Sequence, residues 1–159
     1  MKMYVLGLVI LASAIQASPD TLDHHIGNWG DSIITIRSNL EGACDELSER
    51  ELPILLTVVE NNQTQLECDG FVYRGRKRFV EIMFSDGHLD IIHIMRTESD
   101  HEELKGILKT EYGEPSFSSD QADYYRAVGI SLRTKPHEIS FVSERVRDQY
   151  GDYMRSLGQ

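Results

Sequence analysis

An apolar N-terminal segment followed by only two cysteines constrains the compartment and the fold of this 159-residue chain more than any other feature of its sequence. Residues 1–17 read MKMYVLGLVILASAIQA, a positive residue, an apolar run and small residues in the order typical of a secretory signal peptide. The apolar run is shorter than the ~20 residues that a membrane-spanning helix needs. Export would carry Cys44 and Cys68 into an oxidising compartment, where the two thiols can form one disulfide. The alternative is two separate buried thiols.

The expected domain organisation follows from removal of this N-terminal segment. Cleavage after Ala14 or after Ala17 fits the small-residue rule, and loss of residues 1–17 leaves about 142 residues, one domain in size. Residues 18–30 show no hydrophobic period and are predicted to form a loose N-terminal arm, and residues 31–159 to form the single domain. We expect an exported protein, periplasmic or secreted. Asn62 begins an Asn-Gln-Thr glycosylation acceptor, which matters only if the host glycosylates exported proteins.

The charge of the chain narrows the classes of partner. It carries 26 Asp and Glu residues against 16 Lys and Arg residues, a formal net charge of −10. Proteins that bind nucleic acids draw much of their affinity from the neutralisation of phosphates by basic side chains. A chain this acidic is therefore predicted not to bind nucleic acid.

Hydrophobic periodicity and turn residues predict an α+β fold. Asp31 or Ser32 is suited to cap a first helix that ends at Gly42. Apolar residues at helical spacing predict a second helix that ends at Gly113, and a third that Ser143 can cap. The predicted order is α-ββββ-α-βββ-α, an antiparallel meander with helices packed on one face. The two halves are similar in their order of elements, which is expected either of an old duplication or of simple alternation of helix and meander. The predicted strands are residues 54–60, 63–73, 79–85, 89–96, 122–128, 130–134 and 138–143.

The strongest hairpin signal is Asp86-Gly87 between two apolar runs, because both residues tolerate the positive φ of a type I′ turn. A two-residue turn places Phe84 opposite Leu89 and Val80 opposite His93. In this register His93 lies on the apolar face of the hairpin, whereas Glu81 and Asp90 lie on the opposite face. His93 is then a hydrogen-bonded core or rim histidine, or a general base or pH sensor.

Three segments together resemble the small exported domains of the beta-lactamase inhibitor protein type, which some outer-membrane assembly lipoproteins share. The segments are DSIITIRSNLEG, RFVEIMFSDGHLDIIHI and LKTEYGEP, about half of the mature chain. The resemblance implies the helix-and-meander architecture and a role in protein binding. The lipoprotein anchor of the assembly proteins is absent, and no acidic inhibitor loop maps onto this sequence.

Two features are candidates for a binding surface. Four basic residues of a predicted turn stand out in an acidic chain and could meet an anionic partner, or could be a solvated turn that discourages edge pairing. Trp29, ahead of the first helix, could anchor a partner or fold over the helix as core. The basic residues are Arg74, Arg76, Lys77 and Arg78.

The sequence contains no motif for known catalytic chemistry. There is no Gly-x-Ser-x-Gly elbow and no Gly-rich phosphate loop. The adjacent His24 and His25 point apart on an extended arm, and no pair of ligands has zinc-site spacing, so we expect neither a metal nor a cofactor. The leading hypothesis is an exported, non-catalytic binding domain that engages a protein in the same compartment. The alternative is a small-ligand-binding protein or hydrolase with a cleft around His93.

Overall fold

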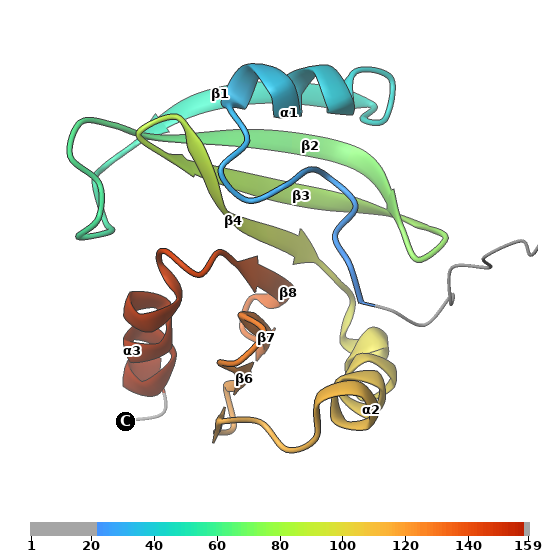
Figure 1. Ribbon diagram of the computed structural model, residues 1–159. Coiled ribbons are helices and arrows are strands. Elements are labelled where there is room, and N and C mark those ends of the chain that lie inside the picture. The colour runs from blue at the N-terminus through green and yellow to red at the C-terminus, as the bar shows by residue number, and fades with distance from the viewer. Residues whose placement is uncertain (1–21, 158–159) are drawn as a thin grey trace, which may run out of the picture.

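The computed structural model describes residues 22–157 and contains one eight-stranded antiparallel sheet with three helices (Figure 1). The strand order is β1-β2-β3-β4-β8-β7-β6-β5, so two four-stranded meanders meet at the central pair β4 and β8. This confirms the α+β class. The strands are β1 (Glu46–Leu52), β2 (Gln63–Tyr73), β3 (Arg76–Ser85), β4 (His88–Met95), β5 (Phe117–Ser118), β6 (Ala122–Tyr125), β7 (Ile130–Thr134) and β8 (His137–Val142). The helices are α1 (Ile33–Leu40), α2 (His101–Tyr112) and α3 (Arg147–Leu157), with a short 3-10 turn, η1 (Glu98–Asp100), before α2.

The helices cover both faces of the sheet, which corrects the expectation that they pack on one. Helices α1 and α2 contribute to one core, and α3 contributes to a second core on the opposite face. Figure 1 shows β6, β7 and β8 running between α2 and α3. We call the side of α1 and α2 the first face and the side of α3 the second face.

The predicted strand at residues 54–60 is wrong, and β1 and β5 were not predicted. β1 is a highly charged edge strand, ELSEREL, whose exposed side chains hide the usual alternation. The segment after Pro53 is apolar for another reason: Leu56 and Val59 pack into the second core from an irregular loop. With β5 included, the order is α-ββββ-α-ββββ-α.

The N-terminal residues and the helix caps differ in part from their predictions. Residues 22–30 are irregular, as expected of an arm, but Leu22 and Ile26 are buried in the first core. The signal-peptide prediction, residues 1–17, lies outside the described residues. Ser32 caps α1 by accepting the N–H of Thr35. Ser143 does not cap α3, because its hydroxyl donates to the buried carboxylate of Asp90.

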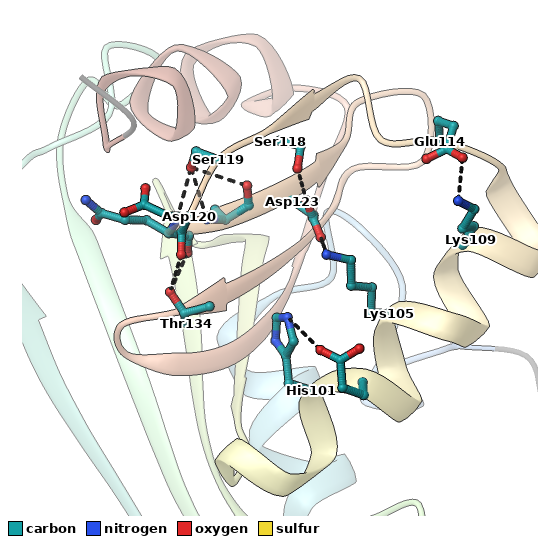
Figure 2. A network of polar contacts seen from close by, with 12 residues as sticks. His101, Lys105, Lys109, Glu114, Ser118, Ser119, Asp120, Asp123 and Thr134 are labelled. Carbon is teal, nitrogen blue, oxygen red and sulfur yellow. Dashed lines mark hydrogen bonds and ion pairs between the residues drawn. The ribbon is translucent and has the colours of Figure 1, made fainter.

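Polar contacts join α2 to the second meander (Figure 2). Asp123 of β6 is buried and accepts a hydrogen bond from the Ser118 hydroxyl. It also forms an ion pair with Lys105 of α2, with 3.3 Å between Asp123 Oδ2 and Lys105 Nζ. Thr134 closes the neighbouring turn by donating to the main-chain oxygen atoms of Asp120 and Gln121. This network therefore stabilises the fold at the far edge of the sheet.

A β-bulge changes the register of the β3–β4 hairpin. Asp86 and Gly87 form the predicted turn with positive φ, and Phe84 lies opposite Leu89 as expected. Asp90 is then an extra residue, so the pairing beyond it was predicted wrongly.

Beyond the bulge, Glu81 lies opposite His93, which therefore shares the second face with Glu81. Val80 lies opposite Ile94 instead, and both are buried in the first core.

The predicted disulfide between Cys44 and Cys68 is confirmed, with the two Cα atoms 5.4 Å apart. Cys44 follows the end of α1, and Cys68 lies on β2 with no exposed surface. The bridge therefore fastens the first helix to the sheet. No helix among the described residues is both long enough and apolar enough to cross a membrane.

Removal of this bridge should destabilise the domain without changing its fold. The bridge spans a sequence separation of 24 residues. Loop-closure entropy for a loop of that length corresponds to ~3.5 kcal/mol. We expect the Cys44→Ala/Cys68→Ala variant to lose about that much free energy of unfolding in urea titrations. An unchanged urea midpoint would contradict this prediction.

Candidate functional site

A cleft of about 660 Å³ lies between the second face of the sheet, helix α3 and the 53–62 loop. Its volume is within the range of small-molecule sites, about 300–1,000 Å³. Most of its lining surface is apolar, although six of the twelve lining residues have polar or charged side chains. We call it the His93 cleft, lined by Leu55, Leu56, Gln63, Met83, Ile91, His93, Arg133, Gln149, Tyr150, Asp152, Tyr153 and Ser156.

The 53–62 loop is held in place by side chains from two other parts of the fold. Gln149 of α3 accepts the N–H of Thr57 at 2.7 Å and donates to the Leu55 carbonyl oxygen. Asp86 accepts the N–H groups of residues 60, 61 and 62 from the hairpin turn, and these hydrogen bonds lower its pKa to about 2. The wall of the cleft is therefore positioned although it has no regular secondary structure.

A polar cluster on three neighbouring strands lies beside the cleft. His93 Nδ1 is hydrogen-bonded to Ser140 Oγ at 2.8 Å, and Glu138 Oε1 lies 3.6 Å from the same nitrogen. Arg133 Nη1 donates to Glu138 Oε1 at 2.7 Å. Burial is the main cause that lowers the pKa of His93, and the nearby Glu138 opposes it. His93 is therefore a neutral hydrogen-bonding group at pH 7.

This arrangement differs from a serine–histidine–acid relay. In such a relay the serine and the acid meet opposite nitrogens of the imidazole ring. Here Ser140 and Glu138 both approach Nδ1, and Ser140 has no exposed surface from which to attack a substrate. The cluster is suited to orient groups and to donate or accept hydrogen bonds.

Two tyrosines of α3 form the opposite wall. Tyr150 is buried with its hydroxyl 3.0 Å from Ser131 Oγ, and burial raises the pKa of Tyr150. Tyr153 is 45% exposed, and the Arg133 guanidinium lies 5.5 Å from the centroid of its ring. Tyr153 thus presents a partly exposed ring beside α3, with the Arg133 guanidinium packed over it.

The four basic residues predicted as an exposed turn, here called the basic turn, are surrounded by acidic partners. Only Arg74 lies in the turn, because β3 begins at Arg76 and contains the other three. Arg76 and Arg78 both pair with the buried carboxylate of Asp100. Burial alone would raise the pKa of Asp100, but the hydrogen bonds from Thr97 and the two arginines together lower it. The two arginines thus serve to hold η1 and the start of α2 against β3.

The other two of these four basic residues, Arg74 and Lys77, are also paired. Arg74 lies at the hairpin turn with a positive φ of 48°, and its guanidinium is 3.4 Å from Glu103 of α2. Lys77 Nζ donates to Asp45 Oδ1 at 2.7 Å. All four basic side chains therefore have acidic partners within the fold.

Trp29 lies apart from the basic turn. It is 40% exposed, with its ring centroid 5.0 Å from that of His24. It borders a hollow of about 780 Å³ that none of the four basic residues lines. The structure therefore does not combine these candidates into one site. Within residues 22–157, no group of three or more His, Cys, Asp or Glu side chains is placed to hold a metal ion.

Comparisons with protein families, curated proteins and solved structures find no match for this chain. The resemblance to the beta-lactamase inhibitor protein type therefore stays a prediction.

His93 stands out in the sequence by residue type, but the residues around it do not. Arg133, Glu138 and Ser140 are polar residues at alternate positions of otherwise apolar strands. Such alternation within buried strands is a signal that polar groups share one face. It could have indicated the cluster, but not that it faces His93.

A His93→Gln variant should report on the neutral state of this histidine. An unfolded histidine titrates near 6.5 and folded His93 titrates lower, so the unfolded state takes up the proton first as the pH falls. The histidine therefore contributes less to wild-type stability at pH 5.5 than at pH 7.5. We expect the variant to lose about 1–2 kcal/mol of unfolding free energy at pH 7.5 and less at pH 5.5. A difference that grows on acidification would contradict this account.

Proposed function

We propose that this chain is an exported, non-catalytic binding domain and that the His93 cleft is its ligand site. The observation that carries the proposal is the cleft itself: a hollow of about 660 Å³ on a sheet surface, mostly apolar in its lining surface, with polar groups among the lining residues. Such a combination is typical of small-molecule sites. The geometry thus favours the alternative of a small-ligand protein over a role for the basic turn.

Two further observations support the proposal. Ser140 is buried, and it approaches the same imidazole nitrogen as Glu138, which argues against hydrolysis by a serine nucleophile. The Cys44–Cys68 disulfide is compatible with maturation in an oxidising compartment.

A protein partner is the second candidate, and a specific observation favours it. Ile54, Leu55 and Tyr153 are large apolar side chains that are 52%, 66% and 45% exposed, and two of them line the cleft. A partner could insert an apolar side chain there, as partners do at binding hot spots.

Binding of N-phenyl-1-naphthylamine, an uncharged dye that fluoresces away from water, tests the ligand site. For a ligand of this size in an apolar cleft we expect a dissociation constant on the order of 10 µM. Leu55→Asp places a charge in the apolar wall and should weaken binding at least tenfold, while its exposed position leaves the fold intact.

Ile54→Asp is the matched control, since Ile54 is the exposed neighbour that does not line the cleft. This variant should bind within threefold of wild type. Absence of dye binding by the wild-type protein, or equal losses in the two variants, would overturn the assignment.

A further inference from the structure

Gln63 brings an unused hydrogen-bond donor to the cleft. Its side chain is 1% exposed, and its Oε1 accepts the N–H of Leu55 at 2.9 Å, which fixes the orientation of the amide group. The Nε2 group has no hydrogen-bond acceptor among the described residues. Buried donors are nearly always paired, because an unpaired one costs free energy. An acceptor that a ligand supplies would remove that cost.

Arg133 brings a second unused donor. Its Nη1 and Nη2 atoms donate to Glu138 and to the Lys135 carbonyl oxygen, but its buried Nε has no partner in the described part of the chain. Gln63 is on β2 and Arg133 on β7, four strand spacings apart in the sheet, or about 19 Å. The cleft is therefore elongated, with a donor toward each end.

The charges around the cleft are balanced. Arg133 is paired with Glu138, and Asp152 is paired with Arg155. An anionic ligand would be repelled by the carboxylates of Glu138 and Asp152. A cationic ligand carries hydrogen-bond donors and no acceptor, so it could not pair with the free donors of Gln63 and Arg133. An uncharged acceptor avoids both conflicts.

Given the proposed function, we infer that the cleft binds an elongated, uncharged, apolar molecule whose carbonyl oxygen accepts a hydrogen bond from Gln63 Nε2. Acyl amides and esters are the chemical class that fits. The carbonyl supplies the missing acceptor, and the hydrocarbon chain lies along the accessible apolar lining at Met83 and Tyr153. The side chain of Leu55, 66% exposed on its loop, is expected to move aside as the ligand enters.

The test is displacement of bound N-phenyl-1-naphthylamine from the mature protein by three compounds with the same chain: octanamide, octanoate and octylammonium. Octanamide should displace the dye at about one tenth of the concentration that either charged compound requires. Octylammonium has no acceptor for Gln63 Nε2, and octanoate has an acceptor but brings a negative charge close to Glu138 and Asp152. Equal or better displacement by octanoate or octylammonium would overturn the inference. It would leave the proposed function standing, because that rests on dye binding and on the Leu55→Asp variant.

A Gln63→Glu variant separates the role of the donor from that of the fold. It keeps an acceptor for the Leu55 N–H but replaces the free donor with a second acceptor. We expect octanamide to bind about tenfold more weakly and octylammonium more tightly than to wild type. An unchanged order of the three compounds would overturn the inference.

Val72→Glu is the control for the added negative charge, because Val72 also lies on β2 but is 59% exposed and does not line the cleft. Octanamide should bind this variant within threefold of wild type. If Gln63→Glu does not fold, Gln63→Met removes the donor without adding charge. It should show the tenfold loss for octanamide with no gain for octylammonium, and retained octanamide affinity would overturn the inference.

Discussion

The β-bulge at Asp90 decides which side chains form the floor of the cleft. Because strand side chains alternate between faces, one extra residue moves every later side chain of β4 to the opposite face. His93 therefore lies on the second face beside Ser140, and Ile94 is buried in the first core. The bulge is held by the buried carboxylate of Asp90, which accepts from Ser143 Oγ at 2.6 Å and pairs with Arg145.

The two faces of the sheet consequently differ in how completely they are covered. The first face is closed by α1, α2 and the packed residues 22–30, and the disulfide fastens the end of α1 to β2. The second face is covered by α3 and the 53–62 loop, which leave a hollow between them. A closed first face and a partly covered second face leave a cleft whose floor is a sheet and whose walls are a helix and a loop.

Local chemistry explains which parts of the fold could be predicted. The Asp86-Gly87 turn, the stop at Gly113 and the bounds of β2 and β7 depend on residues close in sequence, and all are observed. β1 was not predicted, because a charged edge strand lacks apolar alternation. The strand predicted at residues 54–60 was wrong, because an apolar loop has the same local sequence pattern as a buried strand. The bulge was not predicted, because Ser143 and Arg145, the residues that hold Asp90, lie 53 and 55 residues from it in the sequence.

The same reasoning applies to the candidate site. His93 stood out by residue type, but its partner Ser140 is 47 residues away, and the pairing of β4 with β8 brings them together. The basic turn stood out by charge, but the carboxylates that pair with it come from η1, α2 and the start of the first meander. Contacts between residues distant in sequence therefore determine the surroundings of both features.

The central claim is that ligands bind on the second face, in the His93 cleft. A nitrogen–proton correlation spectrum recorded while octanamide is added tests it most directly. The account predicts that the side-chain amide signals of Gln63 move furthest, together with the backbone signals of Met83 and Ile91. Shifts centred on residues 74–78 or on the Trp29 indole, or no shifts at all, would contradict it.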